Sequence, residues 1–371
     1  MILFENVSKQ YPDGTVAVHD LSFECPNGEI TVFVGPSGCG KTTSLRMINR
    51  SIDPTKGRIS LNGQDIKSSK LTDLRRGIGY VIQSGGLFPH RTIVENIMTV
   101  PRLLGWPRNR AKARALELME LVGLNTKLAK RYPYQLSGGQ QQRVGVARAL
   151  AADPPVLLMD EPFAAVDPVV RAELQEEFLR LQREIGKTIV LVTHDIDEAI
   201  KLGDKIAVFR EGGELMQLDS PMELLATPSS EFVRNFLGEG RGIRRLRFIN
   251  GKSVPTTEDL IISEAASPAD ALAQAGLVGT SWLLLTSENR APIGWLHVDD
   301  IGGTGSLTSL QLHPVGSTFG SDDQSLRTML DLAILSPSNN VVLMDAQQKV
   351  ETTACYSDIV AAVFGKAEVR V

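Results

Sequence analysis

The stretch Gly35-Pro36-Ser37-Gly38-Cys39-Gly40-Lys41-Thr42 decides the fold of this chain. It matches the pattern G-x-x-x-x-G-K-[ST], in which a glycine-rich loop surrounds phosphate groups with backbone N–H groups. The apolar run 30–34 precedes the stretch, and a helix-compatible segment, 43–48, follows it. A strand, this loop and a helix in succession form the context that the pattern needs. The stretch therefore predicts an α/β domain that binds a nucleotide.

The residue types in this loop suit polyphosphate chemistry. Gly35, Gly38 and Gly40 allow the backbone to approach phosphate oxygens closely and to adopt unusual dihedral angles. The N–H groups of the loop and the N-terminus of the following helix present positive potential to the phosphates. Lys41 is expected to contact the β- and γ-phosphates, and the Thr42 hydroxyl is expected to ligate Mg²⁺.

Two carboxylates follow a second buried strand. The run 156–159 is continuously apolar, which is typical of strands buried on both faces, and Asp160 and Glu161 come directly after it. Ligand sites in open α/β sheets lie at the carboxyl ends of the strands. Asp160 is therefore expected to hold Mg²⁺, directly or through water. Glu161 is the candidate base that orients and polarises the attacking water, although such a pair alone is more often a helix cap.

A third stretch, Leu136-Ser137-Gly138-Gly139-Gln140, resembles the signature of ABC-type ATPases. The resemblance extends over residues 1 to about 237, because seven motifs follow one another in the family's order. It implies a P-loop NTPase with a RecA-like core and a helical subdomain inserted at about 89–150. In that family the signature closes on the nucleotide held by a second copy. The resemblance thus implies a homodimer and favours Glu161 as the base over a helix cap.

Further site residues follow from this resemblance alone. It implies that Tyr11 stacks on adenine, although a tyrosine of a short core is the alternative, and that His194 senses the γ-phosphate. It also implies that Gln83 contacts Mg²⁺ or water and that Asp167 lies in a loop crossing the dimer interface. The expected catalytic residues are Glu161, His194 and Gln83, and the expected Mg²⁺ ligands are Thr42, Gln83 and Asp160. The expected contacts to ATP are Tyr11, Gly35, Pro36, Ser37, Gly38, Cys39, Gly40, Lys41, Thr42, Thr43, Gln83, Ser137, Gly138, Gly139, Gln140, Asp160 and Asp167.

A narrower resemblance concerns the class of transporter. It lies in the run Gly79-Tyr80-Val81-Ile82-Gln83-Ser84-Gly85-Gly86-Leu87-Phe88-Pro89-His90. The run looks like the ATPase subunits of importers for glycine betaine, choline, carnitine or proline. It implies transmembrane permease subunits, an extracytoplasmic solute-binding protein reached through them, and a place on the cytoplasmic face of the cell membrane. An importer for another solute and a soluble ABC protein are the alternatives.

Composition and charge narrow the classes of protein to which this chain could belong. The chain has 371 residues, 42% hydrophobic and 22% charged, as in ordinary soluble globular proteins. Its net charge of −4 gives no reason to expect nucleic-acid binding. No apolar run reaches the roughly 18 residues of a membrane helix, so any membrane association is expected to come through a partner. Cys25, Cys39 and Cys355 are too few and too widely spaced to indicate a disulfide framework or a zinc site.

The last third of the chain contains an internal repeat. A glycine-rich, basic segment at 238–250 is expected to be a linker, and residues 251–371 are expected to form a second α/β domain. Six identities recur at an offset of 58 residues, from Ser267, Leu272, Ala275, Leu285, Asp300 and Ile301 to Ser325, Leu330, Ala333, Leu343, Asp358 and Ile359. The pair resembles degenerate tandem CBS motifs, a regulatory module that often binds adenine nucleotides. Its departures at His297, Glu351 and Cys355 count against nucleotide binding.

Overall fold

The structure is a computed structural model that describes residues 1–82, 86–164, 166–302, 305–320 and 324–365. The chain divides into two compact units, Met1–Gly238 and Glu239–Val371. Each unit has hydrophobic clusters of its own. Among the helices of the described ranges, none combines the length and apolar character needed to cross a membrane.

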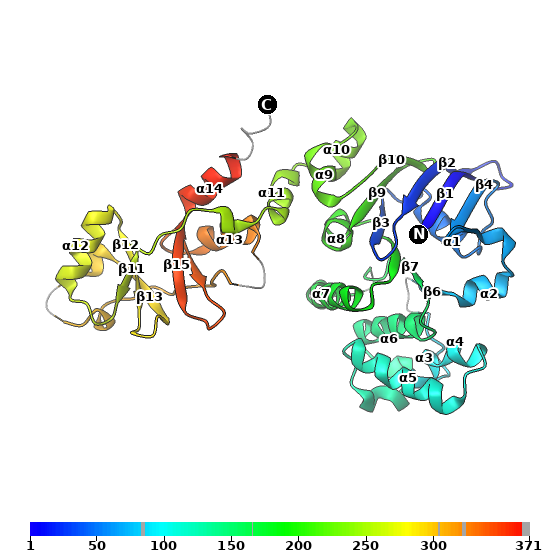
Figure 1. The fold of residues 1–371 in the computed structure, drawn as a ribbon, viewed down its shortest axis with the longest axis horizontal. Coiled ribbons are helices and arrows are strands. Elements are labelled where there is room, and N and C mark those ends of the chain that lie inside the picture. The colour runs from blue at the N-terminus through cyan, green and yellow to red at the C-terminus, as the bar shows by residue number, and fades with distance from the viewer. Residues whose placement is uncertain (83–85, 165, 303–304, 321–323, 366–371) are drawn as a thin grey trace. The chain divides into compact units, whose positions relative to one another are not determined.

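A six-stranded sheet forms the centre of the first unit (Figure 1). Its order is β10-β9-β3-β8-β7-β6, and only β10 runs antiparallel to its neighbour. The strands are β3 (Ile30–Val34), β6 (Ile78–Val81), β7 (Val156–Asp160), β8 (Thr188–Val192), β9 (Lys205–Arg210) and β10 (Glu214–Asp219). Every residue of β3, β7 and β8 is buried, as their continuous apolar runs predict.

An antiparallel sheet of order β2-β1-β4-β5 belongs to the same unit. Its strands are β1 (Ile2–Gln10), β2 (Val16–Cys25), β4 (Lys56–Leu61) and β5 (Gln64–Asp65). Helix α1 (Lys41–Ile48) shares one hydrophobic cluster with both sheets. Phe4 and Phe23 stack at 4.6 Å between ring centroids, and Phe33 and Phe209 from the central sheet pack against this pair. The cluster thus fixes α1 against both sheets.

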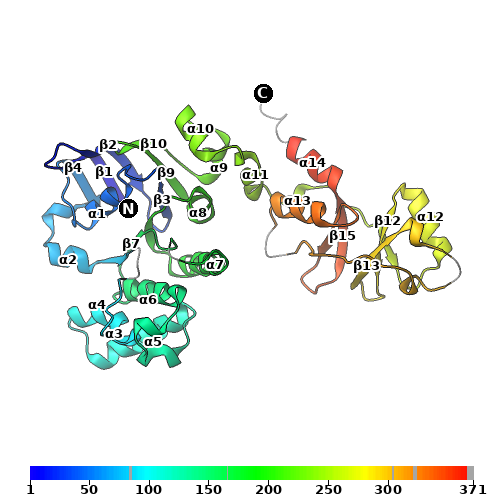
Figure 2. The same cartoon turned by 180° about the vertical axis from the view of Figure 1, so that it is seen from behind.

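The sequence between β6 and β7, which are paired neighbours in the central sheet, contains a helical segment that lies to one side of the sheet (Figure 2). It contains α3 (Ile93–Ile97), α4 (Thr99–Leu103), α5 (Arg108–Leu121) and α6 (Gly138–Leu150). The other helices of this unit are α2 (Leu71–Arg76), α7 (Pro168–Ile185), α8 (Ile196–Leu202), α9 (Pro221–Ala226) and α10 (Glu231–Leu237). The predicted fold class, an α/β core with an inserted helical part, is confirmed.

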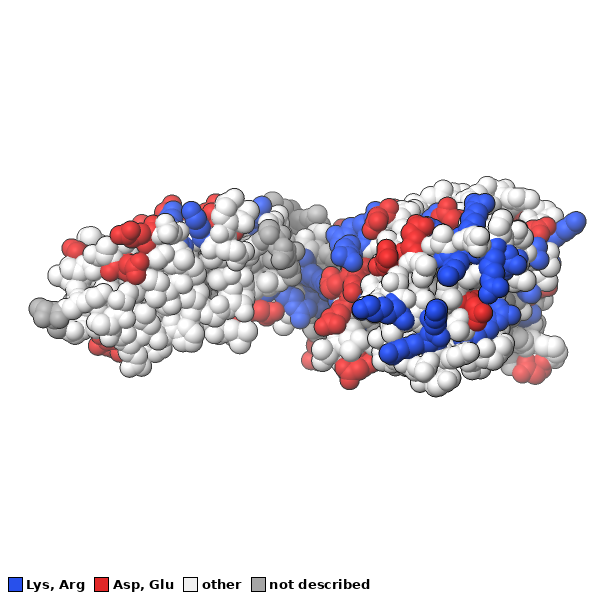
Figure 3. Space-filling model, turned by 90° about the horizontal axis from the view of Figure 1, so that it is seen from below, with Lys and Arg blue, Asp and Glu red and all other residues white. Residues whose placement is uncertain are grey.

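Basic side chains gather on the helical segment. Between residues 91 and 131 the sequence has nine Lys and Arg against three Glu and no Asp, although the whole chain has a net charge of −4. Figure 3 shows Lys and Arg, with some Asp and Glu among them, over one face of the first unit.

The second unit contains two similar halves. The first half has β11 (Ile261–Ser263), α12 (Pro268–Val278), β12 (Trp282–Thr286) and β13 (Pro292–His297). The second half has α13 (Leu326–Leu335), β14 (Asn340–Met344), β15 (Val350–Cys355) and α14 (Tyr356–Gly365). Strands β12 and β13 lie 58 residues before β14 and β15, and Ser267 and Ser325 cap the two corresponding helices. The sequence repeat therefore coincides with a repeated order of elements.

The segment expected to be a linker has regular structure. Residues Arg241–Arg245 form helix α11, and a 3₁₀ turn, Leu246–Phe248, follows it. Leu246 is buried in a hydrophobic cluster of the second unit. The glycine-rich composition predicted a linker, and the glycines of this segment lie mainly around the helix ends. Gly238 follows α10 with φ of 72°, and Gly240 precedes α11.

Candidate functional site

The loop between β3 and α1 has a backbone that only glycine fits at two positions. Gly35 and Gly40 have φ of 153° and 88°. A Cβ atom on Gly35 would lie 2.3 Å from the carbonyl oxygen of Phe209, and one on Gly40 would lie 2.1 Å from that of Ala17. Close approach of neighbouring backbone, together with positive φ, therefore excludes other residues here. The tight turn leads directly into the N-terminus of α1.

Lys41 folds back over this loop. Its side chain is buried, and its Nζ donates hydrogen bonds to the carbonyl oxygens of Gly35 at 2.8 Å and Pro36 at 2.7 Å. The Sγ of Cys39 lies 3.6 Å away, and burial raises the pKa of that thiol. The ammonium group is thus held at the centre of the loop, where the sequence pattern predicts contact with phosphate.

Thr42 and Asp160 meet at the carboxyl ends of the central strands. The Thr42 hydroxyl donates to Asp160 Oδ1 at 2.9 Å, and Asp160 is almost completely buried. Its Oδ2 lies 3.4 Å from the Arg46 guanidinium and accepts a bond from the Tyr80 hydroxyl at 3.4 Å. Burial raises the pKa of Tyr80, and the Asp160 charge raises it further, so Tyr80 stays a neutral donor. Arg46 and Tyr80 were not predicted from the sequence.

Glu161 and His194 lie side by side just beyond β7 and β8. His194 Nδ1 is 3.3 Å from Glu161 Oε2, and 60% of the His194 side chain is exposed against 21% for Glu161. Glu161 has φ of 46°, a conformation uncommon for residues other than glycine. Its N–H donates to the carbonyl oxygen of Val192 at 3.0 Å, so the end of β8 holds the backbone there. Two neighbouring strands therefore set the position of this carboxylate.

Tyr11 reaches the start of α1 from the turn after β1. Its hydroxyl lies 3.5 Å from Thr43 Oγ1, and Lys9 Nζ lies 5.3 Å from the centroid of its ring. Because Tyr11 borders the same helix turn as Lys41 and Thr42, it lies at the edge of the loop.

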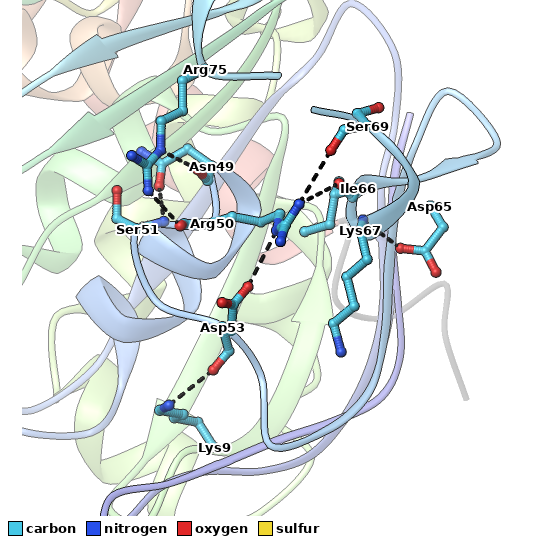
Figure 4. Close-up of polar contacts among 10 residues, drawn as sticks. All are labelled: Lys9, Asn49, Arg50, Ser51, Asp53, Asp65, Ile66, Lys67, Ser69 and Arg75. Atoms are coloured by element: carbon cyan, nitrogen blue, oxygen red, sulfur yellow. Dashed lines mark hydrogen bonds and ion pairs between the residues drawn. The ribbon is translucent and has the colours of Figure 1, made fainter. Parts of the chain in front are cut away.

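Two arginines hold the opposite end of α1 (Figure 4). Arg75 donates to the carbonyl oxygens of Asn49 at 3.2 Å and Arg50 at 2.7 Å, which satisfies acceptors that a helix end leaves open. Arg50 in turn donates to the carbonyl oxygens of Ile66 and Ser69, both at 3.3 Å, and pairs with Asp53. No motif marks these residues, since apart from Asp53 their partners are backbone carbonyls.

The signature stretch forms a separate group. Ser137 is the N-cap of α6, and its side chain and that of Gln140 bond each other's backbone N–H groups in a capping box. A Cβ atom on Gly139 would lie 3.1 Å from a methyl group of Val170 near the start of α7, where Asp167 is the N-cap. Within the described ranges, no hydrogen bond joins Ser137–Gln140 or Asp167 to the 35–42 loop. Gln83 lies outside the described residues.

Comparisons with known proteins show the family of this chain. The family model described as ABC transporter matches residues 18–164. The osmoprotectant import ATP-binding protein OsmV of Salmonella typhimurium is 44% identical over 351 residues, which cover 93% of this chain and 91% of that protein. The chain belongs to the ABC transporter ATP-binding family. Within this family it is also 46% identical to the glycine betaine uptake protein YehX of Escherichia coli, over 81% of this chain and 99% of that protein. Identity to the choline transport protein OpuBA of Bacillus subtilis is 50%, over 71% of each chain.

Solved structures of the family share the fold. The ATP-binding cassette MJ0796, determined as a dimer with ADP and Pi, matches with a TM-score of 0.54 and 35% identity over 60% of this chain and 99% of its own. The cassette cbiO1 of Clostridium perfringens matches with a TM-score of 0.57 and 28% identity over 67% of this chain and 98% of its own. The chain is therefore an ABC-type ATPase that binds a nucleotide, as its motifs predict.

Proposed function

We propose that this chain is the ATP-hydrolysing subunit of an importer for quaternary-amine osmoprotectants such as glycine betaine, choline or carnitine. One observation carries the choice of substrate class. Relatives that match most of this chain at 44–50% identity are named for osmoprotectant import, glycine betaine uptake and choline transport. Solute identity itself is a property of the partner subunits, because the chain described here contributes the motor.

The contacts around the 35–42 loop support a role for each member in ATP turnover. Lys41 exchanges its carbonyl partners for the β- and γ-phosphates of ATP, and the loop N–H groups bind the same oxygens. Glu161 accepts a proton from the attacking water, and His194 holds that carboxylate and contacts the γ-phosphate. Tyr11 offers its ring to adenine.

Thr42 and Asp160 form a donor set that suits Mg²⁺. A hydroxyl and a carboxylate are hard oxygen ligands, and Mg²⁺ is usually held by one or two such groups together with substrate phosphates. The described residues contain no cluster of three or more His, Cys, Asp or Glu. Substrate phosphates and water would supply the remaining ligands when the ion is bound. The ion would neutralise charge that develops on the transferred phosphoryl group. Gln83 is proposed as a further ligand from the sequence pattern alone.

The separation of Ser137–Gln140 from the loop supports an arrangement with two copies. We infer that the N-terminus of α6 in one copy completes the phosphate site of the other, with Ser137 and Gly139 as donors. Asp167, at the start of α7, lies at that interface. Each site then depends on a second chain for part of its electrostatic stabilisation. The dimeric MJ0796 structure supports the same inference.

The partners and location follow from the importer role. Two permease subunits receive the motion of the ATPase dimer through the region of Gln83, and an extracytoplasmic binding protein delivers the solute to them. The chain then lies on the cytoplasmic face of the membrane and has no role with nucleic acid.

The second unit is proposed to be a degenerate tandem CBS-like regulator of the same cycle. Its repeated order of elements supports this proposal, whereas His297, Glu351 and Cys355 argue against nucleotide binding. Ionic strength is the alternative signal, with Arg241, Arg244, Arg245 and Arg247 as contacts to an anionic membrane surface.

The test is ATP turnover of the chain reconstituted with its permease and binding protein. Quaternary-amine solutes are compared with unrelated amino acids and sugars, at low and high salt. Stimulation restricted to quaternary amines supports the proposal. Stimulation by another solute keeps the importer motor and rejects the substrate class, and no stimulation by any solute rejects the transport role.

Regulation is tested by a truncation after Gly238 in the same preparation. If the second unit regulates turnover, the truncated chain loses the salt dependence and keeps solute stimulation. Replacing the four arginines of 241–247 by Gln is the matched variant, because it removes the charge and retains the unit. Salt dependence that survives the truncation rejects the regulatory role.

A further inference from the structure

A buried carboxylate lies four residues after His194. Glu198, on α8, is only 6% exposed. Burial raises the pKa of its carboxyl group, and hydrogen bonds from Thr193 and Gln175 oppose this shift. Taking a carboxylate out of water costs free energy unless hydrogen bonds satisfy its oxygens. The partners of Glu198 therefore show which parts of the molecule this carboxylate joins.

The first partner, Thr193, directly precedes His194. Its hydroxyl accepts a hydrogen bond from the Asp195 N–H at 3.0 Å, so the hydroxyl hydrogen is left to donate to the Glu198 carboxylate. Thr193 is buried, and its own N–H donates to the carbonyl oxygen of Phe33 at 3.1 Å, near the end of β3. The residues on both sides of His194 are thus held by bonds that lead to Glu198 or to β3.

The second partner, Gln175, belongs to α7. Its Nε2 donates to Glu198 Oε1 at 2.9 Å, and both side chains are buried. Arg171, one turn earlier on α7, donates through Nη2 to the carbonyl oxygen of Val166 at 3.0 Å, and its charge also favours the ionised form of Glu198. Val166 directly precedes the N-cap residue of α7. Glu198 therefore lies between the segment of His194 and the first turns of α7.

We propose that Glu198 is a positioning residue for ATP hydrolysis, which acts by fixing His194 beside Glu161. This inference rests on the proposed role of His194 at the γ-phosphate. The His194 side chain is largely exposed, so little packing holds it, and the bonds around its backbone decide where its ring meets Glu161. Because Asp167 at the start of α7 is proposed to lie between two copies, Glu198 also connects that interface to the phosphate site of its own chain.

The test compares kcat and KM for ATP in the full chain with Glu198→Ala, Glu198→Gln and Gln182→Ala. Glu198→Ala should lower kcat by about tenfold to a hundredfold, the effect of a misplaced catalytic group, and leave KM nearly unchanged because the phosphate loop is intact. Glu198→Gln keeps an oxygen for Gln175 and should recover most of that loss. Gln182, the matched control, is a similarly buried side chain of α7 that donates to the carbonyl oxygen of Gly28 at 2.7 Å, just before β3. An unchanged kcat in Glu198→Ala, or an equal loss in Gln182→Ala, would overturn the proposal.

A double-mutant cycle with His194 shows whether Glu198 acts through it. In a His194→Ala background, Glu198→Ala should cause no further loss of kcat, because the group that it positions is absent. A loss as large as in the unmodified background would overturn the proposal and leave the role of His194 intact. If His194→Ala alone turned over ATP like the unmodified chain, the role of His194 would be rejected, and this proposal with it.

NMR of the histidine rings gives a readout that needs no turnover. The His194 resonance is assigned from its loss in His194→Ala, and it should move in Glu198→Ala but not in Gln182→Ala. An unchanged resonance in Glu198→Ala would overturn the proposal. Thr193→Val keeps the shape of the side chain and removes the hydroxyl between Glu198 and the Asp195 N–H, so it replaces Glu198→Ala in each measurement if that variant does not fold. None of these measurements needs the permease, so they are independent of the substrate class.

Discussion

The two halves of the ATP machinery differ in how far one chain assembles them. Around the 35–42 loop, Lys41 bonds carbonyl oxygens of its own loop. Thr42 bonds Asp160, and His194 lies against Glu161, at the ends of adjacent strands. The signature stretch instead bonds to itself through the capping box of α6 and packs against α7. Parallel strands bring their carboxyl ends to the same edge of the sheet whether or not a ligand is bound. The direction of a helix N-terminus on an inserted segment does not depend on that edge. The comparison suggests that the first half acts within a chain and the second acts across two.

Glu161→Gln should have the largest effect on the first half. The amide cannot accept a proton, so ATP turnover should fall by about 10²–10⁴-fold while ATP still binds and the closed dimer accumulates. Single-turnover kinetics and gel filtration with ATP measure both quantities. Glu176→Gln, which alters an exposed carboxylate paired with Lys201, is the control. Turnover near that of the control would remove Glu161 from the role of base.

Lys41→Ala tests whether the loop binds phosphate within one chain. Loss of charge-assisted bonds, each about 1.5–3 kcal/mol, should weaken ATP binding by roughly 10-fold to 100-fold even for the monomer. Equilibrium binding of a fluorescent ATP analogue to dilute protein measures this change. The matched control is Lys187→Ala, which breaks an ion pair with Asp153 away from the loop. Unchanged ATP affinity of the monomer would contradict the inference that the 35–42 loop binds phosphate within one chain.

Ser137→Ala tests whether the signature stretch acts on the nucleotide of a second chain. ATP affinity of the monomer should stay unchanged, while turnover of the assembled protein should fall by about tenfold because one phosphate donor across the interface is lost. The substitution also removes a helix cap, worth about 1 kcal/mol. Ser220→Ala removes the same kind of cap from α9 and corrects for that loss. If Ser137→Ala weakened monomer binding, the signature would belong to the site of its own chain.

Arg75→Ala should have the smallest effect of these substitutions, because Arg75 supports the end of α1 and not the phosphate loop itself. Two carbonyl oxygens at the end of α1 lose their donor, so the free energy of unfolding should fall by roughly 1 kcal/mol. Urea unfolding measures it, with Arg76→Ala on the same helix as the control. ATP affinity should change less than for Lys41→Ala. If the substitution cost more free energy of ATP binding than free energy of unfolding, Arg75 would be part of the site.

The sequence predicts the phosphate loop and its surroundings well because the residues that define them are close together in the sequence. The eight residues 35–42 and the strand that precedes Asp160 carry their own context, and the α/β fold class inferred from them is confirmed, as is the family inferred from the signature stretch and the order of the motifs. The roles of the individual site residues remain predictions. The repeat in the second unit was also visible, because identities at one offset need no knowledge of contacts.

Other features depend on long-range packing and have no local signal. Tyr80 and Arg46 reach Asp160 from elements far from it in sequence, and Arg75 bonds backbone carbonyls, which no side-chain pattern records. The segment 238–250 was expected to be a linker from its glycine-rich, basic composition. Composition does not report that Leu246 in this segment is buried.

The two bonds of Lys41 to its own loop have a consequence for nucleotide selectivity. The ammonium group already donates to the carbonyl oxygens of Gly35 and Pro36, so an anion that takes over these two donors must offer more than the carbonyl oxygens do. A weak or singly charged anion gains little by this exchange, whereas a polyphosphate offers several charged oxygens at once. We therefore expect the loop to favour polyphosphates over the orthophosphate and small organic acids of the surrounding solution.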